Sequence, residues 1–204
     1  MLLDFNNTLE FLKRYGIKTA DAQIFCDSQL AATFAEKIGY PVALKVWGDN
    51  ILHRSDIGGV LLNIQNSEEL KVQFLKIQKI SPQIIVQKMA QGQSVIIGMK
   101  QDPQFGPVIM FGLGGIFVEV LKDVSFRLCP ITQQEAQLMI KEIKGYPILA
   151  GIRGQKPINF SALSAIIVNV SKLAHDNPQI KEIDLNPVLV DENGAVAADF
   201  KFLI

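Results

Sequence analysis

Helical and strand-like segments follow one another along this chain without the strict strand–helix–strand alternation that a doubly wound parallel sheet requires. Near the N-terminus, glycines suit the ends of the helical stretches, and Ser28 and Ser67 are placed to cap the second and third helices. This irregular mixture of helical and strand-like segments predicts an α+β fold. In this part of the sequence we expect helices at 3–15, 28–38 and 67–79 and strands at 41–47 and 60–64.

The rest of the chain is mostly β-like and contains two helical stretches. Thr132 and Glu135 have the spacing of a capping box, which predicts a helix from there to about residue 143. A longer helix is expected at 161–175, after a loop of glycines and prolines at 145–157. The expected strands are 84–89, 95–100, 107–111, 116–120, 125–131, 180–185, 188–190 and 195–202.

A chain of 204 residues can form two small lobes, which we place at 1–82 and 83–204. Its 20 basic and 20 acidic residues balance, so the charge predicts neither a nucleic-acid partner nor an anionic membrane. The longest apolar stretch, 108–120, is shorter than the ~20 residues of a membrane helix. Cys26 and Cys129 lack metal-site spacing and are expected to be buried thiols. With no export segment at the start, the chain is expected to be cytoplasmic.

Lys45 and His53 are candidates for phosphate chemistry. Lys45 interrupts an apolar strand, where its ammonium could bind phosphate oxygens or reach solvent from a sheet edge. His53 lies in a polar loop that ends in Gly58 and Gly59, whose conformational freedom would let the loop move. A surface histidine is the simpler interpretation of His53 on local physics alone.

The glycine run Gly112–Gly115 separates two apolar stretches. Its amides could approach a phosphate closely, although the run matches neither a P-loop nor a dinucleotide fingerprint, and a bulge or tight packing would also explain it.

Further along, Asp184, Asn186 and Asp199 offer oxygen ligands of the kind that magnesium prefers. Glu119 and Arg127 are charged residues within β-like stretches, where they could serve the phosphate site or pair with each other.

Taken in order, these segments resemble a known family. The chain contains YGI, IGYPVALKV, ILHRSDIGGV, IIVQKM, KQDPQFGPVIMFGLGGIFVEVLKDVSFRL, GIRG, EIDLNPVLV and AADF. It is similar to the ATP-grasp domain of NDP-forming acyl-CoA synthetases, and most similar to the β subunit of ADP-forming acetate–CoA ligase, a relative of succinyl-CoA synthetase. The resemblance extends from about Tyr15 to Phe200.

The resemblance implies an ATP-grasp fold of two α+β lobes and an acid–thiol ligase that uses ATP or ADP with Mg²⁺. The reaction would be acyl-CoA + ADP + phosphate ⇌ acid + CoA + ATP, through an acyl phosphate and phosphohistidine. A CoA-binding α subunit would complete a hetero-oligomer, such as α2β2, so this chain alone would be incomplete. The implied catalytic residue is His53, the implied nucleotide-binding residues are Lys45, Gln87, Lys88, Met89, Gly114, Gly115 and Arg127, and the implied magnesium ligands are Asn186 and Asp199.

The chain departs from the family at Ser94, which occupies a position where relatives usually have a glutamate. That departure favours an alternative function, a regulatory or nucleotide-sensing ATP-grasp domain like those attached to some protein lysine acetyltransferases. Retention of His53, Asn186 and Asp199 favours the enzyme.

Overall fold

The computed structural model describes residues 1–48, 51, 54–115, 122–152, 154 and 156–204. The chain forms two compact units, one of residues 20–90 and one of residues 1–19 with 91–204. This division differs from the boundary expected at residue 82. The reason is strand β4 (Gln83–Lys88), which pairs with strands of the smaller unit and so belongs to it.

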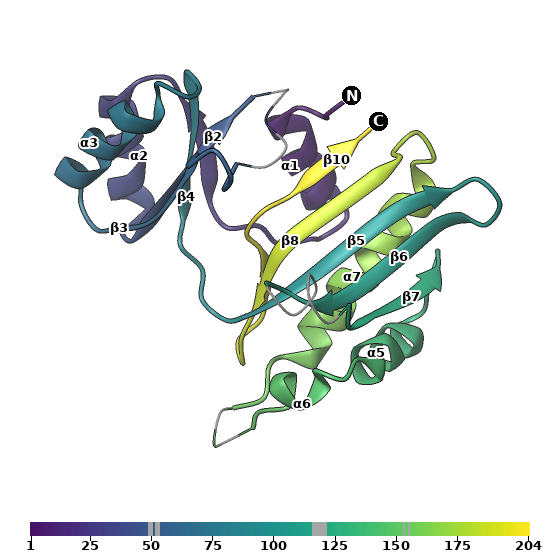
Figure 1. The fold of residues 1–204 in the computed structure, drawn as a ribbon. Helices are drawn as coiled ribbons and strands as arrows, with labels where there is room; N and C mark the ends of the chain where they lie inside the picture. The colour runs from purple at the N-terminus through teal and green to yellow at the C-terminus, as the bar shows by residue number, and fades with distance from the viewer. Residues whose placement is uncertain (49–50, 52–53, 116–121, 153, 155) are drawn as a thin grey trace. The chain divides into compact units, whose positions relative to one another are not determined.

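The smaller unit is a four-stranded antiparallel sheet in the order β1-β4-β2-β3. Two helices cover one face of it (Figure 1), and the core between them includes Leu44, Phe74 and Val86. The elements are β1 (Ala22–Phe25), α2 (Ser28–Ile38), β2 (Val42–Trp47), β3 (Val60–Ile64), α3 (Ser67–Ile77) and β4.

The caps of α2 and α3 lie one residue before the predicted ones. Asp27, not Ser28, caps α2, and its carboxylate accepts hydrogen bonds from the N–H groups of Gln29 and Leu30. Asn66, not Ser67, caps α3. In each case two adjacent polar residues could serve, and the residue with extended backbone does so.

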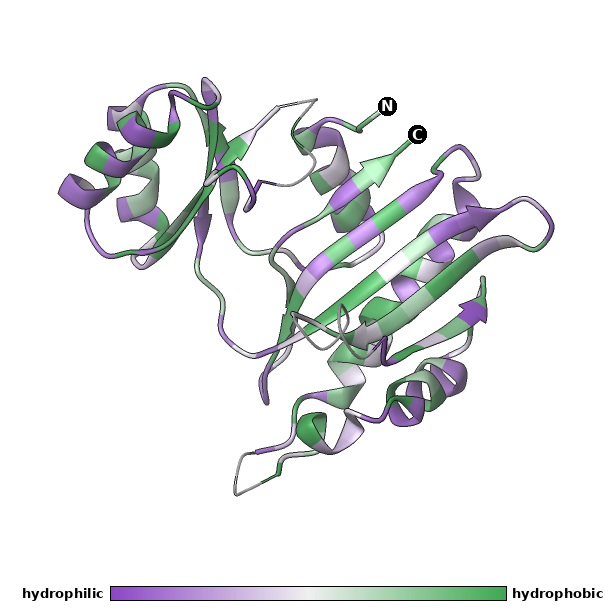
Figure 2. Cartoon of the chain, in the orientation of Figure 1, coloured by the Kyte–Doolittle hydropathy of each residue, from purple (hydrophilic) through white to green (hydrophobic). Residues whose placement is uncertain are grey.

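The larger unit is built on a six-stranded antiparallel sheet in the order β10-β8-β5-β6-β7, with β9 also paired to β8. Helices α5 and α7 cover one face (Figure 1), and β8 alternates between hydrophobic and hydrophilic residues (Figure 2), as a strand with one covered face does. Its helices are α1 (Phe5–Arg14), α5 (Gln133–Glu142), α6 (Tyr146–Leu149) and α7 (Phe160–Asp176), and its strands are β5 (Gln93–Asp102), β6 (Gly106–Leu113), β7 (Val124–Leu128), β8 (Glu182–Val190), β9 (Ala195–Ala197) and β10 (Lys201–Leu203).

The last strands differ from the prediction. The stretches expected at 180–185 and 188–190 form the single strand β8, whereas the strand expected at 195–202 is broken into β9 and β10. Strand β8 is continuous although its pairing with β5 contains an irregularity. Val188 pairs with Val95 and Leu185 with Ile97, so Asn186 and Pro187 together oppose one residue of β5, which is a β-bulge.

The structure confirms one predicted helix cap and differs from the prediction in two short elements and in the exposure of the cysteines. The capping box of Thr132 and Glu135 is confirmed. Helix α6 and strand β1 were missed, since each has only four residues and depends on tertiary contacts. Cys26 is exposed, contrary to prediction, and Cys129 is half-buried. Residues 116–120 lie outside the described residues. Among those described, no helix is long and apolar enough to cross a membrane.

Candidate nucleotide and metal site

Lys45 lies on the face of the smaller sheet opposite its helices. The neighbours Leu44 and Val46 belong to the core under α2 and α3, so the alternation of the strand turns Lys45 to the other face. Its side chain is only 7% exposed, and it pairs with Val60 on one side and Ile85 on the other. Lys45 is therefore on a central strand, and the edge-strand explanation does not hold.

Gln87 shares that face. It lies opposite Ala43 in β2, two residues from the partner of Lys45, and is 4% exposed. An amide and an ammonium group thus occupy one side of two neighbouring strands. A buried polar pair of this kind can recognise a polar ligand such as a nucleotide.

Lys88 and Met89, which follow Gln87 among the predicted nucleotide-binding residues, make contacts within the smaller unit. The ammonium of Lys88 donates to the carbonyl oxygens of Gly39 (2.8 Å) and Tyr40 (3.0 Å). The main-chain N–H of Met89 donates to the carbonyl of Pro41 at 3.1 Å. The side chain of Gln87 lies on the face that carries Lys45, whereas that of Lys88 lies on the helix side.

The predicted catalytic residue, His53, lies outside the described residues. The loop after it begins with Arg54, whose guanidinium carbon lies 5.0 Å from the centre of the Trp47 ring, a cation–π contact that the sequence analysis missed. The loop then turns tightly, because the Gly59 N–H donates to the Arg54 carbonyl at 2.8 Å. Gly59 has no room for a side chain, since a Cβ would lie 2.4 Å from a methyl group of Val46.

In the larger unit, Gly114 of the glycine run is in direct contact with Ser94. The Gly114 N–H donates to the Ser94 carbonyl at 2.8 Å. A Cβ on Gly114 would lie 2.1 Å from Ser94 Oγ and 3.0 Å from its carbonyl carbon, so only glycine fits. Gly115 has φ +67°, which also favours glycine. Close packing against Ser94 therefore explains the glycine at 114, and the positive φ explains the glycine at 115. Ser94 is thus a direct neighbour of the glycine run.

The main chains of the two predicted magnesium ligands are hydrogen-bonded to each other at the bulge in β8. The Asn186 N–H donates to the Asp199 carbonyl at 3.2 Å, and the Pro187 carbonyl accepts from the N–H groups of Ala198 and Asp199. One carboxylate oxygen of Asp199 accepts from the Phe200 N–H at 3.1 Å. The bulge thus lies beside the break between β9 and β10, and Asn186 is exposed there.

A depression of about 410 Å³ lies further along the face of this sheet that α5 and α7 leave uncovered. Gly98 forms its floor between Met110 and Asp184 in neighbouring strands, and Phe126 contributes to its wall. Asp184 is two residues from Asn186 on the same side of β8, so this face continues from the depression to the bulge.

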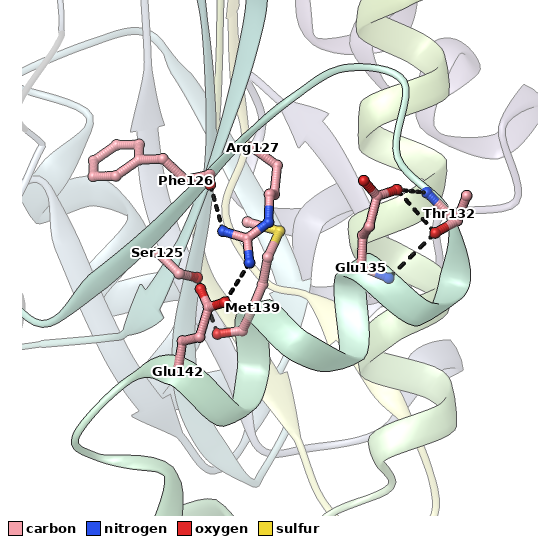
Figure 3. A network of polar contacts seen from close by, with 7 residues as sticks. All are labelled: Ser125, Phe126, Arg127, Thr132, Glu135, Met139 and Glu142. Atoms are coloured by element: carbon pink, nitrogen blue, oxygen red, sulfur yellow. Dashed lines mark hydrogen bonds and ion pairs between the residues drawn. The ribbon is translucent and has the colours of Figure 1, made fainter.

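Arg127 lies on the other face of the same sheet. Its guanidinium pairs with Glu142 of α5 and donates to the Phe126 carbonyl, while the neighbouring Ser125 hydroxyl donates to the Met139 carbonyl of α5 (Figure 3). The expectation that Arg127 faces phosphate does not fit this placement, because the α5 side of the sheet is opposite the face of Asp184 and Asn186. Glu119, the alternative partner of Arg127, lies outside the described residues.

The described residues fit a magnesium nucleotide. Asn186 and Asp199 supply an amide and a carboxylate, which are the hard oxygen donors that Mg²⁺ accepts when phosphates complete its shell. Gly115 is exposed and has no side chain, so its main chain is accessible to a phosphate, whereas Gly114 is buried against Ser94. In the smaller unit, considered by itself, Lys45 supplies a positive charge. No larger cluster of histidine, cysteine or carboxylate ligands occurs among the residues that the structure describes.

Comparison with known proteins places these features in a family. The ATP-grasp domain model matches residues 1–204. The β subunit of acetate–CoA ligase [ADP-forming] I from Pyrococcus furiosus is 48% identical over 205 residues, which cover 96% of this chain and 88% of that subunit. The 4-hydroxybutyrate–CoA ligase [ADP-forming] from Nitrosopumilus maritimus is 45% identical over 91% of this chain, but only 28% of its own length is covered.

One solved structure has a similar fold over the whole length of this chain. The dinucleotide-forming acetyl-coenzyme A synthetase 1 of Ca. Korarchaeum cryptofilum, in complex with coenzyme A, Ca-AMPCP and HgCl⁺, has a TM-score of 0.93 at 36% identity and covers 100% of this chain and 93% of the matched chain. In another complex, with coenzyme A and Mg-AMPPCP, the phosphohistidine segment of that enzyme points towards its nucleotide-binding site. The predicted resemblance and fold class are confirmed. The chain belongs to the ATP-grasp domain family, in the group that includes the β subunits of ADP-forming acetate–CoA ligases.

Proposed function

We propose that this chain is the ATP-grasp β subunit of an NDP-forming acyl-CoA synthetase and transfers a phosphoryl group between a phosphohistidine and ADP or ATP. The observation that carries the proposal is the pairing of Asn186 with Asp199 at the β8 bulge. Ser94 of the adjacent strand β5 holds Gly114. Asn186 lies in β8, Asp199 lies between β9 and β10, and Gly115 follows the end of β6, so all three belong to the same sheet or to its connections.

Each residue has a role that follows from its chemistry. Asn186 and Asp199 would hold Mg²⁺, which neutralises phosphate charge when bound. Lys45 places its ammonium against phosphate oxygens, and Gln87 recognises the base by its amide. Gly115 offers its main-chain N–H group, and Gly114, whose own N–H is bound to Ser94, lets the main chain pack closely enough to hold Gly115 in place. Phosphoryl transfer depends chiefly on such positioning and charge stabilisation, so these residues need supply no covalent chemistry themselves.

The covalent step belongs to His53 in this proposal. A neutral imidazole is a nucleophile at neutral pH and can accept a phosphoryl group from a partner's phosphohistidine and pass it to ADP. The support for this role is the resemblance of the ILHRSDIGGV segment. The partner would be a CoA-binding α subunit, and the complex would work in the cytoplasm, where thiols such as exposed Cys26 remain reduced.

The experiment uses the complex of this chain with its α subunit, Mg²⁺ and ATP labelled on the γ-phosphate. We expect acid-labile label on His53, and loss of both label and turnover in His53→Asn. The matched control is His175→Asn, which changes the other histidine of the chain, an exposed residue at the end of α7. If His53→Asn still carries label on this chain and supports turnover, the relay is ruled out.

A further inference from the structure

Lys88 ends strand β4 with its side chain over the end of a helix. Its ammonium donates to the carbonyl oxygens of Gly39 and Tyr40 at 2.8 and 3.0 Å. Gly39 is the C-cap of α2, with φ +80°, and Tyr40 follows it. We call these three residues the Lys88 clamp. A cation at a helix C-terminus is favourable because the last carbonyls carry partial negative charge.

The main chain around Lys88 is tied to the same place. The Lys88 N–H donates to the Asp21 carbonyl at 2.9 Å, just before β1, and the Met89 N–H donates to the Pro41 carbonyl, just before β2. In the sheet, Lys88 lies opposite Val42 and Gln87 lies opposite Ala43. The clamp therefore joins the end of α2, the first residue of β2 and the last residue of β4.

Strands β2 and β4 also carry the polar residues on the face of the sheet opposite its helices. Lys45 is three residues along β2 from Val42, and Gln87 directly precedes Lys88. Lys88 itself pairs with Val42, a residue of the core on the helix side, so its side chain and that of Gln87 leave β4 on different sides. Lys88 can fix the position of Gln87 and Lys45 without sharing their face.

We propose that Lys88 is a positioning residue for nucleotide binding: its ammonium fixes the start of β2 against the end of β4 and thereby sets where Lys45 and Gln87 lie. This rests on the proposed function, which gives those two residues their ligand. It replaces the direct nucleotide contact that the resemblance implies for the Lys88 side chain.

The test compares Lys88→Met, Lys88→Arg and Gly39→Ala in the full chain. Affinity for Mg·ADP is measured by titration, and main-chain amide exchange of residues 42–44 and 86–89 is measured without nucleotide. Lys88→Met should weaken binding about tenfold, the usual effect of losing a charge-assisted hydrogen bond, and should speed exchange at Met89. Lys88→Arg should stay within about threefold of wild type, because a guanidinium can also donate to two carbonyls.

Gly39→Ala disturbs the clamp from its other side. A Cβ there would lie 3.2 Å from the Lys88 ammonium nitrogen and would strain a residue at positive φ. It should therefore weaken binding and speed exchange as Lys88→Met does. The control is Lys37→Met, an exposed lysine in the last turn of α2, which should change neither measurement.

If Lys88→Met weakens binding while exchange without nucleotide is unchanged, Lys88 contacts the nucleotide directly and the proposal is wrong. It is also wrong if Lys88→Met changes neither measurement. If the wild-type chain in its complete complex binds no Mg·ADP, the proposed function fails instead. The exchange result then decides on its own whether the clamp holds the two strands.

Discussion

The main-chain N–H of Asn186 donates a hydrogen bond to the carbonyl oxygen of Asp199, 13 positions further along the chain, at 3.2 Å. The bond exists because β8 has a bulge at Asn186 and Pro187, opposite the break between β9 and β10. Bulges commonly redirect side chains beside active sites. Here the bulge and the break place the main chains of an asparagine and an aspartate side by side.

Asp199→Asn should weaken Mg·ADP binding by roughly 10- to 100-fold, because one anionic magnesium ligand is lost. The fold should be retained, since an asparagine amide oxygen can still accept the Phe200 N–H. Titration calorimetry with and without Mg²⁺ measures the effect. Asp21→Asn, at an exposed carboxylate of the smaller unit, is the matched control. Equal affinities for Asp199→Asn and wild type would remove Asp199 from the site.

Lys45→Met should lower turnover of the complete enzyme by about 100-fold, because a preorganised positive charge is removed from the transferring group. Lys45→Arg should recover only part of it, since a guanidinium differs from an ammonium in shape. Trp47, the one tryptophan of the chain, lies two residues away on the same face, so its fluorescence should report nucleotide binding in each variant. Normal turnover of Lys45→Met would contradict the proposed contact of Lys45 with the transferring phosphoryl group.

Gly114→Ala should destabilise the fold by about 1–3 kcal/mol, the usual cost of overpacking, and should weaken nucleotide binding. The added methyl group would overlap Ser94 Oγ. Ser94→Ala should be mild alone and should relieve part of the defect in the double variant, leaving the close contacts with the Ser94 main chain and Cβ. Thermal unfolding measures the stability of the single variants and of the double variant. Gly194→Ala, where a Cβ meets open space, is the control.

Arg127→Ala should leave the affinity for nucleotide unchanged within about twofold, because Arg127 pairs with Glu142 on the helix-covered face. Loss of this partly exposed pair should lower the free energy of unfolding by about 1 kcal/mol. Glu142→Gln should have a similar effect on stability. A tenfold loss of affinity in Arg127→Ala, with Glu142→Gln unaffected, would restore the phosphate role that the resemblance implies.

Acid should weaken the capping box of α5. The Thr132 N–H, followed by its hydroxyl, lowers the pKa of Glu135 below its ordinary value of 4.5. A carboxylate with a lowered folded-state pKa stabilises the fold above its unfolded-state pKa, and this contribution is lost as pH falls through the folded-state value. The stability difference between wild type and Glu135→Gln should therefore shrink below pH 4.5, as measured by urea unfolding at several pH values. If the stability difference between wild type and Glu135→Gln stays constant with pH, ionised Glu135 does not stabilise the capping box.

Features that depend on neighbouring residues were predictable. The capping box needs only Thr132 and Glu135, three positions apart, and the sequence places them correctly. The strand around Lys45 is marked by its apolar neighbours. The adjacent caps Asp27 and Asn66 were missed by one residue, because pairs of polar side chains give the sequence two similar choices.

Features that depend on distant residues were not predictable. Arg127 finds its partner Glu142 only because α5 packs on β7, and Lys88 finds Gly39 only because β4 pairs with β2. The resemblance transferred roles to both residues by position in the sequence, which carries no information about which face of a sheet a side chain occupies once bulges and pairing shift the register.

The sequence by itself determined the family, the α+β class and the set of candidate residues, because these depend on residue types in a fixed order. Only the tertiary structure decided that Asn186 meets Asp199, that Gly114 rests on Ser94, and that Lys88 holds a helix end. Hydrogen bonds and close packing act over a few ångströms between segments that lie far apart in the chain, so folding alone brings these partners together.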